Sequence, residues 1–115
     1  SEAANVVLPE AVSSNLSRYM LGSWKVSKDW QESFQGVIHS DGTVRAQVVP
    51  NTKDFSWIHE LLLRLWNEYQ IPGLINTSFN KQGQPILHYL KDAKDAALNL
   101  GLDAVVVEGV LDVIN

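Results

Sequence analysis

One amphipathic helix, predicted from Asp54 to Gln70, constrains the fold of this chain more than any other segment. Its apolar residues recur at alternating spacings of three and four, which is the period of one helix face. Asp54 is the expected N-cap, and Pro72 with Gly73 ends the helix. Because such a face is normally buried, we expect its apolar side chains to pack in the core. They are Phe55, Ile58, Leu61, Leu62, Leu65, Trp66 and Tyr69.

Short strand-like segments precede this helix. Residues Arg18–Val26 mix apolar and small side chains and predict a strand, and Lys28–Gln35 is a polar connection. The β-branched runs Gly36–His39 and Thr43–Val49 then predict a hairpin. Gly42 lies in its turn, where a tight hairpin requires a positive φ.

Arg45 lies between β-branched neighbours on the second hairpin strand. The strand period of two gives an apolar face and an opposite face on which Arg45 lies beside Gln47. If that face lines a cleft, a rigid guanidinium can bind a carboxylate or phosphate; otherwise Arg45 is an exposed cation of an edge strand. The predicted faces are Val44, Ala46 and Val48 on one side and Thr43, Arg45, Gln47 and Val49 on the other.

Further elements are predicted after the long helix. Gly73–Asn76 reads as a short buried strand, and Lys91–Leu100 as a helix closed by Gly101. Ala104–Val107 and Val110–Ile114 form either a hairpin or one strand broken by a bulge. The expected total is five or six strands with two main helices, an α/β fold of α+β-like composition.

The loop Asn76–Pro85 holds the densest group of polar residues outside the termini. It follows a predicted strand, where side-chain amides, hydroxyls and backbone N–H groups can converge on a small anion or polar substrate. The alternative is that Asn76, Thr77 and Ser78 only satisfy the backbone of a turn.

Histidine and carboxylate spacing predicts no metal or acid–base centre. His39, His59 and His88 are too far apart in sequence for a recognisable metal motif. His59 is expected on the helix surface, where Glu60 and Arg64 form a favourable pair one turn apart. The later carboxylates are interpreted as solvated groups: Asp92, Asp95, Asp103, Glu108 and Asp112.

Composition excludes several classes of function. Nine Lys and Arg against thirteen Asp and Glu give a formal net charge of -4, with no basic cluster, so nucleic acid is not an expected partner. An anionic ligand must be held locally by one or two cations and backbone N–H groups. The absence of cysteine excludes a disulfide framework, a thiolate zinc site and a cysteine nucleophile. A reducing cytoplasm is the expected location.

The length of 115 residues predicts one domain with a single core, since about two-thirds of the surface of such a chain can be buried. No apolar run reaches the roughly 20 residues of a membrane span, so no membrane partner is expected. The opening residues show no strong periodicity, and the chain begins at Ser1 without Met. We interpret the chain as a fragment of a longer protein, and we expect no signal peptide in its opening residues.

Two stretches resemble the C-terminal domain of the O-carbamoyltransferases, the family of nodulation and antibiotic-tailoring enzymes. HSDGTVRAQVV, residues 39–49, is similar to the family run H-x-D-G-T/S-x-R-x-Q. PGLINTSFNKQGQPI, residues 72–86, is similar to P-x-L-x-N-T-S-F-N-x-x-G-E-P-I, and KDAKDAALNLGLDAVVV continues the likeness. With YML at residues 19–21, the resemblance covers nearly all of the chain from Tyr19 onward.

The resemblance implies a YrdC-like fold, a twisted open mixed sheet. It implies that residues 18–115 are a C-terminal domain fragment, with 1–17 an N-terminal extension or a remnant of cutting. In the family this part helps to bind carbamoyl phosphate and ATP and to form carbamoyl-adenylate. A separate N-terminal domain, related to sugar kinases and heat-shock ATPases, holds a metal and passes the carbamoyl group to a hydroxyl. The basic stretches W-G-P-R-A-L-G and K-x-R-E-x-F-R-P-F-A-P precede the matched region in the family.

The resemblance also assigns residue roles. Arg45 is the catalytic residue and clamps phosphoryl charge, while His39 and Asp41 set the hairpin. Gly83 allows close backbone approach, and Lys81 is a candidate substitute for a basic residue of the family motif. The ligand-contacting residues implied by the polar loop are Asn76, Thr77, Ser78 and Asn80. We therefore expect Arg45 to face this loop across a cleft.

Two neutral amides depart from the family pattern. Gln82 and Gln84 stand where the family commonly has a basic residue and Glu, and Tyr89–Lys91 replaces a capping Thr-Pro-Glu. The alternative function is therefore a non-catalytic binding or regulatory module with the same fold. Expected partners are small-molecule anions and the upstream domain of the same chain, with a homodimer left open.

Overall fold

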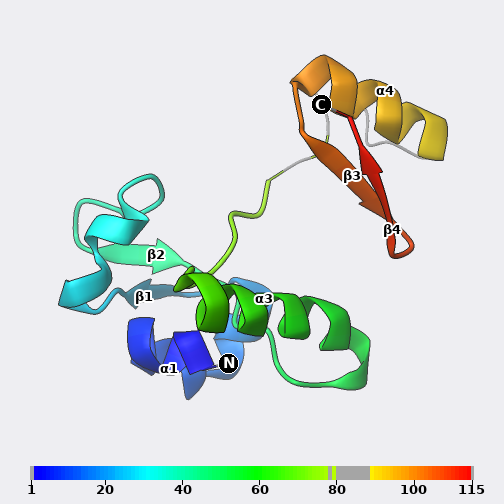
Figure 1. The fold of residues 1–115 in the computed structure, drawn as a ribbon. Helices are drawn as coiled ribbons and strands as arrows, with labels where there is room; N and C mark the ends of the chain where they lie inside the picture. The colour runs from blue at the N-terminus through cyan, green and yellow to red at the C-terminus, as the bar shows by residue number, and fades with distance from the viewer. Residues whose placement is uncertain (1, 78, 80–88, 115) are drawn as a thin grey trace. The chain divides into compact units, whose positions relative to one another are not determined.

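The computed structural model describes residues 2–77, 79 and 89–114. The chain divides into two compact units, Ser1–Leu74 and Ile75–Asn115. The first unit contains short helices, a two-stranded sheet and one long helix, and the second contains a helix and a hairpin (Figure 1). In order, the elements of the first unit are α1 (Glu2–Val7), α2 (Pro9–Val12), the 3₁₀ helix η1 (Asn15–Tyr19), β1 (Ser23–Lys25), the 3₁₀ helices η2 (Lys28–Trp30) and η3 (Glu32–Phe34), β2 (Thr43–Arg45), the 3₁₀ helix η4 (Lys53–Phe55) and α3 (Ser56–Tyr69).

The strand β2 pairs antiparallel with β1, in the register Ser23↔Arg45, Trp24↔Val44 and Lys25↔Thr43. Of the strand predicted over Arg18–Val26, only Ser23–Lys25 form a strand in the structure. The residues before it form the 3₁₀ helix η1, in which the Ser14 side chain accepts a hydrogen bond from Leu16 N. Met20 then adopts a left-handed conformation, with φ of 57°, and this ends η1 before β1 begins.

The turn predicted at Gly42 is confirmed, but the strand predicted over Gly36–His39 is wrong. Gly42 has φ of 80° and donates its N–H to the carbonyl of His39 at 2.9 Å, and His39 N donates to Thr43 O at 2.8 Å. The residues before this turn form a further turn instead of an extended strand, because the N–H groups of Val37 and Ile38 both donate to the carbonyl of Phe34. The ladder partner of β2 is consequently β1.

The core of the first unit joins its N-terminal helices to this sheet. Its buried side chains are Val7, Leu8, Ala11, Val26 and Val44, and the partly buried side chains around them are Trp24, Trp30, Phe34, Ile38, Ala46 and Val48. Backbone bonding reinforces the join, since Ser27 N donates to Val7 O at 2.9 Å and Ser27 Oγ donates to Val6 O at 2.8 Å. Residues 1–17 thus contribute to the core, while their description as an extension stays a prediction.

The predicted long helix is confirmed as α3, with corrected ends. The 3₁₀ helix η4 precedes it, so Asp54 is not its N-cap, and the chain leaves it at Gln70 in a left-handed conformation with φ of 56°. Glu60 and Arg64 form the predicted pair, with 3.1 Å between Oε1 and Nη2.

Burial of the apolar face of α3 is less complete than predicted. No residue of α3 is fully buried, and Trp57, one residue before Ile58 of the predicted stripe, is 68% exposed. The helix packs against α1, and Trp66 contacts Trp30 with 5.1 Å between ring centroids. These contacts cover one part of the face and leave Phe55, Leu61 and Tyr69 exposed.

The buried strand predicted over Gly73–Asn76 is wrong. Residues 71–77 form no strand, and Ile75 is 72% exposed. Leu74 is also 58% exposed, and Pro72 supplies no N–H for a sheet ladder. The division between the two units falls here, between Leu74 and Ile75.

The second unit holds α4 (Leu90–Leu100), β3 (Ala104–Val107) and β4 (Val110–Val113). The predicted helix and its closing glycine are confirmed, since Gly101 follows α4 with φ of 68°. β3 and β4 form an antiparallel hairpin, which decides between the hairpin and the bulged strand. Its turn residues, Glu108 and Gly109, both have positive φ, as a two-residue hairpin loop requires.

Helix α4 covers one face of this hairpin. It packs against β3, where Val105 is buried, and Lys94 forms an ion pair with Asp112 of β4 at 2.5 Å. Asp112 is therefore more than a solvated carboxylate. The opposite face carries Val106, Leu111 and Val113, all exposed.

The fold is a mixture of helix and strand, as predicted, but the sheet prediction of five or six strands is wrong. The described residues form four strands in two separate two-stranded sheets. Two of the predicted strands, over residues 36–39 and 73–76, are not strands in the structure, and the predicted strand Thr43–Val49 is shortened to Thr43–Arg45. In the described part of the chain, no helix is long and apolar enough to cross a membrane.

Candidate functional site

The polar face of β2 is the candidate site, because it carries the arginine singled out in the sequence. Val44 is buried, whereas Arg45 is exposed, and the alternation continues past the strand, where Gln47 is exposed between partly buried neighbours. The predicted division into an apolar and a polar face is thus confirmed at these positions. The face lies above the core, since Val44 is buried with Val7 and Val26.

Arg45 and Gln47 are each fixed by a backbone carbonyl of the preceding segment. Arg45 Nη2 donates to Met20 O at 3.3 Å, and Gln47 Nε2 donates to Arg18 O at 2.9 Å. Val48 N, next along the chain, donates to Ser17 O at 3.0 Å. These bonds bring the YML and HSDGTVRAQ stretches together in space.

The turn before β2 carries a compact hydrogen-bond network. Asp41 Oδ1 accepts from Thr43 N at 3.0 Å and from Thr43 Oγ1 at 2.6 Å. His39 Nδ1 lies 3.2 Å from the same Thr43 oxygen. The Thr43 hydroxyl, followed by the Thr43 N–H, lowers the pKa of Asp41 below its ordinary value of 3.8, and nearby His39 contributes in the same direction. Asp41 is therefore an anion at neutral pH.

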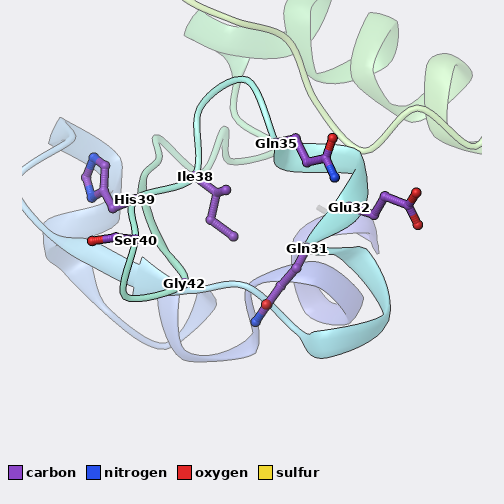
Figure 2. Close-up of a pocket in the computed structure, with 7 residues that line it drawn as sticks. All are labelled: Gln31, Glu32, Gln35, Ile38, His39, Ser40 and Gly42. Atoms are coloured by element: carbon purple, nitrogen blue, oxygen red, sulfur yellow. The ribbon is translucent and has the colours of Figure 1, made fainter.

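A shallow pocket of about 410 Å³ lies beside this turn (Figure 2). The Ile38 side chain points into it, whereas the His39 ring points away from Ile38, on the other side of the turn. Gln31 is held at the rim by a hydrogen bond from Nε2 to Val26 O at 3.2 Å. Sequence reasoning missed this pocket, because Lys28–Gln35 was interpreted only as a polar connection. The two amide side chains Gln31 and Gln35, four residues apart on either side of η3, are the signal that could have found it.

The remaining predicted site residues are not gathered by the described structure. His39, Asp41 and Arg45 lie in the first unit, while Asn76 and Thr77 lie in the second and are exposed. Four predicted residues fall outside the described part of the chain: Ser78, Asn80, Lys81 and Gly83. The cleft predicted between Arg45 and the polar loop stays a prediction.

No metal centre is formed within the residues that the structure describes. Among them, no three His, Asp or Glu side chains lie close enough together to hold an ion. His59, predicted on the helix surface, is half-buried on α3.

These features define an α+β domain with an exposed, hydrogen-bonded polar strand face next to a tight turn. A family model described as "Carbamoyltransferase C-terminus" matches residues 1–113, and the chain belongs to this family. The resemblance seen in the sequence motifs is thereby confirmed. No solved structure matches the chain.

Several curated proteins are similar to the chain. An uncharacterized protein of Methanocaldococcus jannaschii is 31% identical over 91 residues, which is 79% of this chain and 18% of that protein. Nodulation protein NolO of Bradyrhizobium diazoefficiens is 35% identical over 72 residues, 62% of this chain and 13% of that protein. Nodulation protein NolNO of Sinorhizobium fredii is 38% identical over 72 residues, 62% of this chain and 10% of that protein. The chain thus spans less than a fifth of the length of these relatives.

Proposed function

We propose that this chain is part of an O-carbamoyltransferase that binds carbamoyl phosphate and ATP and helps to form carbamoyl-adenylate for transfer to a hydroxyl acceptor. The observation that carries the proposal is the exposed Arg45 on the polar face of β2, in a chain that belongs to the carbamoyltransferase C-terminus family. The location that goes with this function is cytoplasmic, where ATP is available.

Arg45 has the chemistry that adenylation needs. Carbamoyl phosphate first loses its phosphoryl group to water, which gives carbamate and inorganic phosphate. When an oxygen of this carbamate then bonds to the α-phosphorus of ATP and pyrophosphate leaves, negative charge accumulates on the phosphoryl oxygens. A guanidinium held on a rigid strand stabilises that charge without first having to reorganise. The bond from Arg45 Nη2 to Met20 O orients the group while its side chain stays exposed.

The polar loop supplies the second half of the proposed anion site. Asn76 and Thr77, with Ser78 and Asn80, offer amide and hydroxyl groups to the ligand, and Gly83 lets the backbone approach it. Lys81 adds a cation in place of the basic residue that Gln82 replaces. The metal and the hydroxyl-acceptor site belong to the upstream domain that is the proposed partner of this one.

The neutral pair Gln82 and Gln84 favours a second candidate, a non-catalytic binding or regulatory module. Replacing a basic residue and a glutamate by two amides removes a charge pair from the ligand loop. Such a module would bind the same anions as the enzyme without forming the adenylate.

The deciding experiment uses the longer protein that contains this chain. Carbamoyl-adenylate formation is followed as exchange of labelled pyrophosphate into ATP in the presence of carbamoyl phosphate. We expect exchange in the wild type, strong loss in Arg45→Ala, and full exchange in Arg64→Ala, a matched exposed arginine on α3. Binding of both ligands without any exchange establishes the module instead, and exchange that ignores Arg45→Ala contradicts the proposed role of Arg45.

A further inference from the structure

Three residues of the turn before β2 form a chain of hydrogen bonds with a fixed direction. Asp41 is ionised at neutral pH, and an ionised carboxylate only accepts hydrogen bonds. The Thr43 hydroxyl has a single proton, and its 2.6 Å contact with Asp41 Oδ1 uses that proton. The Thr43 oxygen is left as an acceptor.

The direction of this bond determines the protonation of His39. Its Nδ1 lies 3.2 Å from Thr43 Oγ1, so Nδ1 must carry the proton and donate it. In a neutral imidazole with Nδ1–H, the lone pair is on Nε2. The hydrogen bonds that run from His39 through Thr43 to Asp41 therefore leave Nε2 of the exposed His39 as a hydrogen-bond acceptor.

This acceptor belongs to the same polar face as Arg45. Thr43 and Arg45 are two residues apart on β2, on the same side and about 7 Å apart along the strand. Figure 2 shows the His39 ring pointing away from the Ile38 side chain, and His39 and Ile38 both line the pocket beside the turn. The face thus combines a group that only donates, the guanidinium, with a group that only accepts, Nε2.

We propose that Thr43 is a positioning residue that fixes His39 in its Nδ1–H form, so that His39 Nε2 accepts a hydrogen bond from the amino group of carbamoyl phosphate. The substrate part of this proposal rests on the proposed function. Carbamoyl phosphate has the matching pattern, since its phosphate oxygens accept from Arg45 and only its amino group donates. His39 thereby selects a carbamoyl group over an acyl group of the same size.

The protonation of His39 is tested without any ligand. In ¹⁵N NMR spectra of the histidine-labelled chain, above the pH at which its rings titrate, we expect His39 Nδ1 to have the shift of a protonated nitrogen and Nε2 that of an unprotonated one. Thr43→Val, which keeps the shape and removes the hydroxyl, should move His39 toward the Nε2–H form, while Thr43→Ser should preserve the wild-type pattern. His59 is the internal reference. A wild-type His39 with Nε2–H, or a pattern unchanged in Thr43→Val, overturns the positioning role.

Substrate selection is tested with acetyl phosphate, in which a methyl group replaces the amino group. We expect the longer protein that contains this chain to bind carbamoyl phosphate roughly threefold to tenfold more tightly than acetyl phosphate, the value of one hydrogen bond. Thr43→Val should abolish this preference, Thr43→Ser should keep it, and Arg45→Ala should weaken both ligands equally.

The outcomes separate the two proposals. Equal affinity of the wild type for both ligands, with loss in Arg45→Ala, overturns the role of His39 and leaves the proposed function supported. Binding of neither ligand contradicts the proposed function. ATP also has a donor amino group, so its affinity is compared with that of inosine triphosphate, which lacks this group. If Thr43→Val removes only a preference for ATP over inosine triphosphate, His39 binds the amino group of ATP and the carbamoyl assignment is overturned.

Discussion

Arg45 donates a hydrogen bond to the carbonyl oxygen of Met20, a residue 25 positions earlier in the chain, at 3.3 Å. Met20 itself is in the left-handed conformation that ends η1, with φ of 57°. The exposed guanidinium is therefore held against a backbone turn instead of moving freely on its long side chain. This fixed orientation is the basis for treating Arg45 as a phosphate-binding group.

Replacing Arg45 by alanine should weaken phosphate binding without unfolding the protein. We expect the affinity of the longer protein for carbamoyl phosphate to fall by about 1.5 to 3 kcal/mol, the value of a charge-assisted hydrogen bond. The free energy of unfolding should change by less than about 0.5 kcal/mol, because the side chain is exposed. Calorimetric titration and urea denaturation measure the two quantities. A large loss of stability would show that Arg45 has a structural role instead.

Lys81→Ala is the companion change in the polar loop. If Lys81 replaces the family's basic residue, carbamoyl phosphate affinity should fall in the same titration, by less than in Arg45→Ala because an ammonium makes fewer directed bonds. An unchanged affinity would favour the non-catalytic module.

The N-terminal helices should be required for folding of the first unit. Val7 is 2% exposed in the core, so Val7→Ala should lower the free energy of unfolding by about 1 to 3 kcal/mol. Val6, its neighbour on α1, is 49% exposed, and Val6→Ala is the matched control with little expected effect. Urea denaturation followed by tryptophan fluorescence compares the two. Equal effects would mean that α1 does not pack as described.

Acidification should release the turn at Asp41. Because its pKa in the folded chain lies below 3.8, ionisation of Asp41 stabilises the fold above that pH, and the contribution disappears as the pH falls through the folded value. In Thr43→Val the pKa should rise toward 3.8, since the hydroxyl is the main cause of the shift. NMR titration of the carboxyl carbon measures both values. A pKa that is the same with and without the hydroxyl would contradict the 2.6 Å bond.

The 115-residue chain alone should fold but yield no carbamoylated product. Its sequence contains neither of the basic stretches that precede this region in the family. Incubation with carbamoyl phosphate, ATP and hydroxyl acceptors, analysed by mass spectrometry, should show no product. Reproducible turnover by this chain would refute the assignment of the transfer step to another domain.

The two main helices were predicted well because their signals are local, whereas α1 and α2 were not predicted, because the opening residues show no strong periodicity. The spacing of apolar residues and the terminating Pro72 fixed α3 to within two residues, and Gly101 fixed the end of α4. The turn at Gly42 was likewise read from a residue that tolerates positive φ, whereas at Glu108–Gly109 the sequence left a hairpin and a bulged strand open. Strand pairing was predicted less well, because a β-branched run such as residues 36–39 forms a strand only if another strand pairs with it. In the structure β2 pairs with β1 instead of with residues 36–39.

The candidate site was predicted only in part, for the same reason. Strand alternation was sufficient to place Arg45 and Gln47 on one face opposite Val44. The carbonyl groups that hold them, from Arg18 and Met20, could not be foreseen, because they depend on the left-handed residue that ends η1. The role of Thr43 also went unnoticed, since a threonine on a strand is ordinary until its distances to Asp41 and His39 are known.

The bond from Ser27 N to Val7 O joins residues 20 positions apart and ties the end of the first helix to the residues just after β1. The amide of Val26 next to it donates to Gly42 O, so two consecutive amides connect three distant parts of the first unit. Both bonds lie beside the buried core that contains Val7 and Val26. In hydrogen exchange, the amides of Val26 and Ser27 therefore belong to one cooperative opening event, and their protection reports on the first unit as a whole.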